Sequence, residues 1–218
     1  MSDLARAPLW AIRAQQASAI GYAVASLVVD DLSVLSLWTI LLTLLSVAVL
    51  QLQAALLPNL LSLRAVEPFD VSLQRFRRVY LWSLGGSTVQ FGFLTLLWLS
   101  ALVSPDDTDA FNVGTFAMVL VAWSFSLYAS FRVLVTFVVA LQQPRDLPVR
   151  AELREWLLRS ALAGGLFALL NVAESVRGQD VAKALAWPDV VPLALFALVA
   201  GLDAVVPLLI RRALARVP

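Results

Sequence analysis

The sequence predicts an all-α membrane protein: a polytopic transmembrane helical bundle of six spans, with cytoplasmic N- and C-termini. Two observations lead to this fold class. Hydrophobic residues make up 61% of the 218 residues and charged residues only 14%, whereas a soluble domain carries about 25% charged residues. The apolar residues also gather in runs of roughly 20, which is the length of helix that crosses the hydrocarbon core of a bilayer.

Six such runs follow one another along the chain. Residues 32–57 and 79–104 contain no charged side chain, and residues 111–141 contain only Arg132. These are the clearest spans, because an uncharged apolar run of this length is typical of a transmembrane helix. The predicted spans are residues 8–29, 32–57, 79–104, 111–141, 156–176 and 188–210.

The first span is the weakest of the six, since Arg13 lies about one turn inside it. The alternative is a five-span protein in which residues 8–28 lie on the outer membrane surface. That arrangement leaves Arg6 and Arg13 outside, against the tendency of basic residues to stay in the cytoplasm. Six spans are therefore the favoured prediction.

Basic residues set the predicted orientation, because connectors rich in arginine stay on the cytoplasmic side. With the N-terminus inside, the outer connectors hold only Arg177 and Lys183. The cytoplasmic segments hold thirteen of the sixteen basic residues: Arg6, Arg13, Arg64, Arg75, Arg77, Arg78, Arg145, Arg150, Arg154, Arg159, Arg211, Arg212 and Arg216. Because the bias toward arginine suggests a GC-rich bacterial genome, we expect the bacterial cytoplasmic (inner) membrane.

The connectors are too short to hold a soluble domain, so residues 1–218 are predicted to form a single transmembrane domain. Residues 68–78 (PFDVSLQRFRR) predict a short amphipathic helix that lies at the level of the lipid headgroups. Its Arg75, Arg77 and Arg78 are candidates for contact with anionic headgroups at the cytoplasmic face.

Small and polar residues recur along one side of several predicted spans, including Ser46, Gln53 and Ser87 and the Gly-Gly pairs at 85–86 and 164–165. In lipid, small residues let helices approach closely and polar side chains form hydrogen bonds between helices. Helix packing is therefore the favoured interpretation. The alternative is that the polar side chains line a transport pathway, and spacing alone does not distinguish the two.

Two charged residues fall deep inside spans, where an ionised side chain costs about 2.5–3.5 kcal/mol on insertion scales. Arg132 precedes Gln142 by about ten residues, and Asp203 precedes Arg211 by eight. At 1.5 Å per residue, both lie roughly 12–15 Å from the inner boundary. Because the two helices run in the same direction, the sequence predicts a mid-membrane Arg132–Asp203 ion pair.

Asp203 is the sharper candidate for binding an ion, because Gly201 and Pro207 flank it. Proline supplies no amide to the carbonyl four residues earlier, which is that of Asp203. We therefore expect a kinked helix with a carboxylate and a freed carbonyl, as in the broken helices of transporters. The alternative is that Asp203 only neutralises Arg132 and holds the bundle together.

Three further residues are candidates for ligand or ion binding. Tyr128 lies one turn from Arg132 on the same helical face, while Asn171 and Glu174 lie one turn apart near the outer end of the fifth span. Glu174 could act as an outer ligand or, alternatively, pair with Arg177 at the membrane boundary.

The chain contains no cysteine and no histidine, which excludes disulfides, thiolate or imidazole metal sites and the usual imidazole base. Glycine-rich phosphate loops and hydrolase motifs are also absent. We therefore predict no catalytic residues, no metal and no cofactor. A net charge of only +1 gives no indication of a nucleic-acid partner.

Three functions remain. The favoured one is a small transporter or channel for an ion or small solute, with Arg132 and Asp203 at the polar site. The alternative is a non-catalytic membrane subunit or scaffold that binds partner transmembrane helices. An intramembrane enzyme that uses Asp203 and Glu174 is the least favoured. A homo-oligomer or a partner membrane subunit is expected, because six short-looped helices rarely enclose a wide pathway alone.

Overall fold

The computed structural model describes residues 3–29, 34–103, 110–177 and 190–217, and this part of the chain is helical throughout apart from short connectors. The helices are α1 (Asp3–Val29), α2 (Val34–Leu61), α3 (Val71–Val103), α4 (Ala110–Gln142), α5 (Leu147–Arg177) and α7 (Val190–Leu214). The all-α class predicted from the sequence is confirmed.

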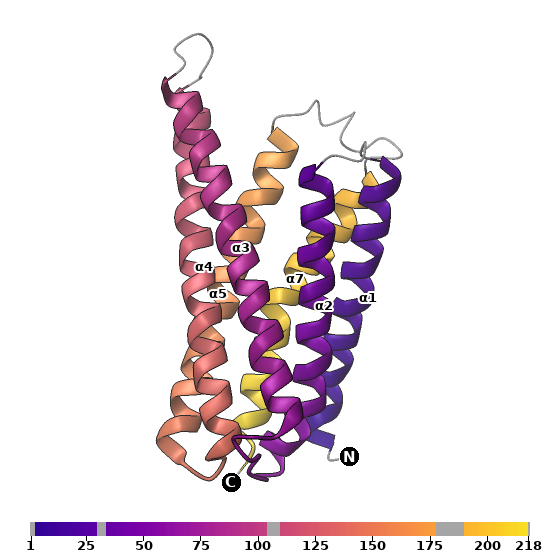
Figure 1. Cartoon of the computed structure of the whole chain (residues 1–218), viewed down its shortest axis with the longest axis vertical. Coiled ribbons are helices and arrows are strands. Elements are labelled where there is room, and N and C mark those ends of the chain that lie inside the picture. The colour runs from indigo at the N-terminus through magenta and orange to yellow at the C-terminus, as the bar shows by residue number, and fades with distance from the viewer. Residues whose placement is uncertain (1–2, 30–33, 104–109, 178–189, 218) are drawn as a thin grey trace.

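The six helices form a closed ring. Each helix packs against the next along the chain, and α7 returns to pack against α1 (Figure 1). Both termini lie at one end of the bundle, together with the α2–α3 and α4–α5 connectors, and we call this the terminal end (Figure 1). Neighbouring helices in the ring are therefore antiparallel.

Three of the described helices are long and apolar enough to cross a membrane, over Leu37–Leu61 in α2, Ala117–Gln142 in α4 and Ala194–Leu214 in α7. They alternate around the ring with α1, α3 and α5. The protein is thus an all-α membrane protein built as a helical bundle.

Two helices begin eight or nine residues before the apolar runs that predict them. Residues 68–78 do not form a separate helix, because α3 runs without interruption from Val71. Asp70 sets its start, since the Asp70 carboxylate accepts hydrogen bonds from the amides of Ser72 at 2.8 Å and Leu73 at 3.2 Å. Helix caps of this kind fix where a helix begins, whereas hydropathy locates only the apolar part of it.

The fifth helix shows the same difference. It begins at Leu147 instead of residue 156, after Asp146, whose carboxylate lies 3.5 Å from the amide of Val149. Its first turns carry Glu152 and other charged side chains. The sequence prediction missed these turns because charged residues there do not prevent helix formation, only insertion into lipid.

The densest apolar core lies at the terminal end. Phe76 of α3 and Phe137 of α4 are each 1% exposed, and their rings lie 5.5 Å apart. Leu60 and Ile210 are fully buried in the same cluster. The core therefore closes the ring at this end.

Large apolar side chains cover much of the outer surface of the ring. Trp10, Trp82, Val121 and Leu169, on four different helices, are each at least 70% exposed. Exposed apolar surface of this extent on a soluble protein would favour association. Here it gives the helices a lipid-compatible exterior.

Glycines permit close helix contacts at two places in the ring. A methyl group on Gly86 would lie 2.4 Å from Leu42 of α2, and one on Gly164 would lie 3.9 Å from the Asp203 carbonyl oxygen of α7. The neighbouring Gly85 has nothing within 4 Å. The packing interpretation is thus correct for one glycine of the first pair and for the second pair, where Gly165 faces Ala204.

Candidate functional site

A cavity of about 320 Å³ lies inside the helix ring, and every described helix contributes to its wall. Much of the wall is polar. The polar lining residues are Gln15 of α1, Ser46 and Gln53 of α2, Tyr80, Ser83 and Ser87 of α3, Ser126 and Ser130 of α4, Ser160 of α5 and Asp203 of α7. We call this space the central cavity.

Asp203 is the charged residue of this lining, and the described wall contains no arginine or lysine. Its side chain is exposed even though α1 and α5 pack against α7 on both sides. Since Asp203 lines the central cavity, its uncovered surface faces that space. A carboxylate there has no neighbouring cation to neutralise it.

Gln15 of α1 contacts the Asp203 carboxylate of α7, where the two helices pack together. The side-chain nitrogen of Gln15 donates a hydrogen bond to Asp203 Oδ1. Gln15 is only 6% exposed, and its Oε1 makes no hydrogen bond within the described structure. Because the amide nitrogen is engaged by Asp203, the Gln15 oxygen is left as an acceptor without a donor.

Aromatic side chains form another part of the wall. Trp123 lies 5.5 Å from Phe167 and 5.4 Å from Phe91, as measured between ring centroids. The hydroxyl of Tyr80 donates a hydrogen bond of 3.0 Å to the carbonyl of Ser130. These contacts hold the rings of α3, α4 and α5 in place beside the cavity.

Local sequence positions Asp203 in two ways. Gly164 lets α5 approach the Asp203 backbone, and Pro207 supplies no amide to the Asp203 carbonyl. The helix is continuous from Val190 to Leu214 with Pro207 inside it, and the expected kink at this proline stays a prediction. Packing against α1 and α5 supports the helix across the missing hydrogen bond.

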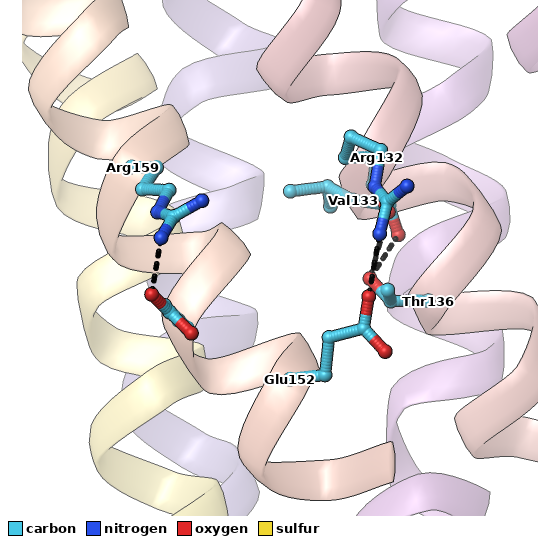
Figure 2. Close-up of polar contacts among 6 residues, drawn as sticks. Arg132, Val133, Thr136, Glu152 and Arg159 are labelled. Carbon is cyan, nitrogen blue, oxygen red and sulfur yellow. Dashed lines mark hydrogen bonds and ion pairs between the residues drawn. The ribbon is translucent and has the colours of Figure 1, made fainter.

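The predicted Arg132–Asp203 ion pair is wrong. Arg132 instead pairs with Glu152 of α5, with Arg132 Nη2 lying 2.6 Å from Glu152 Oε1 (Figure 2). Equal depth did not bring Arg132 and Asp203 together, because α5 packs between α4 and α7 in the ring. Depth along a helix can be counted from sequence, but the neighbours of a helix cannot.

Arg132 belongs to a cluster on the α4–α5 contact, which we call the outer seam. The guanidinium carbon of Arg132 lies 4.9 Å from the Trp156 ring centroid, and that of Arg159 lies 4.7 Å from it. Tyr128 meets the same ring edge-on at 5.5 Å and is 51% exposed. Arg159 pairs with Glu155 (Figure 2).

None of the outer seam residues lines the central cavity. Arg132 and Glu152 retain side-chain exposures of 35% and 47%. The structure thus brings Arg132 and Tyr128 together but separates both from Asp203. Of the three predicted binding residues whose side chains the structure describes, Arg132 and Tyr128 lie in the outer seam and Asp203 lines the central cavity.

The other predicted residues are two on α5 and three arginines on α3. Asn171 and Glu174 lie on α5, and their side chains are outside the described part of the structure. Arg75, Arg77 and Arg78 are exposed on the first turns of α3, at the terminal end. Among the described residues, no three acidic side chains gather in a way that could hold a metal ion.

Gln15 was missed as a site residue. A polar pair such as Gln15 and Gln16 inside an otherwise apolar span is itself a signal of a polar site. Ser46, Gln53 and Ser87, for which helix packing is the favoured prediction, also line the central cavity. The same residue spacing is compatible with both roles.

The fold and the cavity define the class of the protein: an all-α membrane protein whose helix ring surrounds a polar cavity. Comparisons with protein families, with curated proteins and with solved structures find no match to this chain. The function of the chain is therefore inferred from the residues of its cavity.

Proposed function

We propose that this chain is an integral membrane transport protein in which an ion or small solute passes through the central cavity and binds at Asp203. One observation carries the proposal: a carboxylate, a buried amide and several hydroxyls face a shared space inside a bundle whose exterior is apolar. Ionisable residues inside membrane bundles that face a cavity commonly mark transport pathways.

The same proposal includes six spans with both termini in the cytoplasm. Each described helix has 25 residues or more, and about 20 residues are enough to cross the hydrocarbon core. The polar residues of α1, α3 and α5 are explained in part by the cavity, toward which Gln15, Ser83 and Ser160 turn. Because some of their polar side chains face the cavity and not lipid, α1, α3 and α5 can cross a membrane as part of the ring.

Arginine placement supports the orientation. The terminal end carries Arg75, Arg77 and Arg78, which are exposed, and basic residues favour the cytoplasmic side with its anionic lipids. Arg13 and the 77% exposed Trp10 line a hollow between α1 and α2, a combination typical of a membrane boundary. We propose that the terminal end meets anionic headgroups of a bacterial inner membrane.

The transport proposal is tested by electrical recording from proteoliposomes on a solid support, with gradients of protons, Na⁺, K⁺ and putrescine. We expect a current that protein-free vesicles lack and that Asp203→Asn reduces at least about tenfold, as loss of a charge-assisted contact predicts. Glu152→Gln, a carboxylate change in the outer seam, serves as the control and should retain the current. A protein silent in every gradient would contradict transport.

The outer seam favours a second candidate, a membrane subunit that binds a partner helix. Tyr128, Arg132 and Glu152 place polar groups on the outside of the ring, where lipid offers them no hydrogen bonds. A second copy of the chain or a partner subunit would cover them. Disulfide crosslinking of Tyr128→Cys, in a chain without other cysteines, tests this: a crosslinked dimer in membranes supports it, and a monomer contradicts it.

A further inference from the structure

We propose that the central cavity binds a small organic cation through a protonated amine, an inference that names the solute class of the proposed transport function and rests on it. Four features of the molecule support this assignment: the charge of the cavity, the orientation of one amide, the aromatic wall and the size of the space. Each of these restricts the chemistry of the occupant.

The first restriction is charge. Asp203 faces the cavity, and the described lining offers no arginine or lysine to pair with it. Ionisable groups inside membrane bundles normally pair with an opposite charge, and the Gln15 amide that donates to Asp203 is neutral. A cationic occupant would supply the counter-charge that the described lining lacks, whereas an anion would be repelled by the Asp203 carboxylate.

The second restriction is the orientation of Gln15. Its amide nitrogen is held by Asp203, so the amide cannot turn without losing that hydrogen bond. The Gln15 oxygen is buried with no donor in reach, and a buried acceptor of this kind is normally satisfied. The Asp203 carboxylate accepts hydrogen bonds in the cavity, and the buried Gln15 oxygen beside it is an acceptor without a donor, which fits an occupant with several N–H donors.

The third restriction is the wall. Tyr80, Trp123, Phe167 and Phe196 line the same space as Asp203. Aromatic faces attract cations, and aromatic cages recognise ammonium groups in this way. A carboxylate and four aromatic rings in one cavity fit an organic ammonium group with an apolar body.

The size of the cavity agrees with this assignment. Its volume of about 320 Å³ falls within the range of pockets that take small organic ligands, about 300–1,000 Å³. An alkali metal ion instead requires a tight cage of oxygen ligands. The cavity is larger than such a cage, and its serine hydroxyls are spread over α2, α3, α4 and α5.

Calorimetric titration of the detergent-purified full chain tests the inference with matched pairs of probes. Putrescine is compared with 1,4-butanediol, and butylamine with 1-butanol, at neutral pH, with NaCl as a separate titrant. We expect saturable binding of the two amines and at least about tenfold weaker binding of the alcohols, because these lack the charge. Equal binding of amine and alcohol, or binding of Na⁺ alone, would overturn the inference.

Variants locate the site. Asp203→Asn should weaken amine binding at least about tenfold, and Gln15→Leu about two- to tenfold, as the loss of a charged and a neutral hydrogen bond predicts. Glu152→Gln should bind as the wild type does. Unchanged binding in Asp203→Asn would refute the site. Should that variant fail to fold, the comparison of amines with alcohols on the wild-type protein decides.

The experiment also separates the inference from the transport proposal. Amine binding without current in proteoliposomes leaves the binding site standing and refutes transport. Current carried by protons or alkali ions without amine binding supports transport and refutes the amine site.

Discussion

Arg132 of α4 and Glu152 of α5 form an ion pair of 2.6 Å on the outside of the helix ring. The pair leaves Asp203 as a carboxylate without a cation in the described part of the molecule, and the two polar sites are therefore independent. This separation determines the first prediction.

Reversing the charge at Arg132 should destabilise the protein through the outer seam. Arg132→Glu places a second carboxylate beside Glu152 and removes the cation over Trp156, and we expect a loss of about 1–2 kcal/mol, since both partners are partly exposed. Exchanging the charges with Arg132→Glu and Glu152→Arg should restore part of the loss. Thermal unfolding in detergent measures both variants, and no recovery in the exchanged variant would contradict the ion pair.

The hydrogen bond between Gln15 and Asp203 should appear as an energetic coupling between α1 and α7. In a double-mutant cycle with Gln15→Leu and Asp203→Asn, residues in direct contact couple by about 0.5–3 kcal/mol. The same cycle with Gln15→Leu and Glu152→Gln should be additive, because Glu152 belongs to a different cluster. Chemical denaturation in mixed micelles measures the free energy of unfolding of the wild type, the two single variants and the double variant. If the effects of the two single changes simply add in the first cycle, the contact is excluded.

The two glycines of α3 should respond differently to alanine. Gly86→Ala puts a methyl group 2.4 Å from the current position of Leu42 Cδ2, whereas Gly85→Ala meets nothing within 4 Å. Overpacking typically costs about 1–3 kcal/mol, and Leu42 can relieve part of it by changing rotamer. We therefore expect Gly86→Ala to be less stable than Gly85→Ala by about 1 kcal/mol.

The melting temperatures of the two alanine variants test this difference, since both gain the same helix preference of alanine over glycine. Equal melting temperatures would show that α2 and α3 are further apart than the structure places them.

The aromatic contact at the terminal end should contribute strongly to stability. Phe137 is 1% exposed and packs on Phe76, whereas Phe131, two turns earlier on α4, is 46% exposed. Phe137→Ala should lower stability by about 3–5 kcal/mol, as for buried aromatic residues generally. Phe131→Ala should change it far less, because an outward side chain meets lipid in place of protein. Similar losses in the two variants would contradict the position of the core.

Cysteine labelling tests the proposed six-span topology on a chain that has no cysteine of its own. Phe69 is 88% exposed in the α2–α3 connector at the terminal end, so Phe69→Cys should resist a membrane-impermeant maleimide in intact cells. Asp107→Cys, a change in the connector that the sequence predicts on the outer side between the third and fourth spans, should react. Both should react after permeabilisation. Labelling of Phe69→Cys in intact cells would reverse the orientation, and equal protection of both would refute a span between them.

The sequence alone determined the all-α class, the membrane environment and the approximate position of every described helix. These properties follow from local composition, because an apolar run of about 20 residues satisfies its backbone only as a helix once water is removed. The sequence also identified Asp203, since a lone carboxylate in an apolar run stands out without any knowledge of its neighbours.

Only the tertiary structure decided which residues meet. The ring places α5 between α4 and α7, so that Arg132 pairs with Glu152, and it closes α7 onto α1, so that Gln15 reaches Asp203. It also turned serines of several helices toward one cavity. Hydropathy and spacing describe one helix at a time, whereas these contacts depend on how small residues such as Gly164 let separate helices approach.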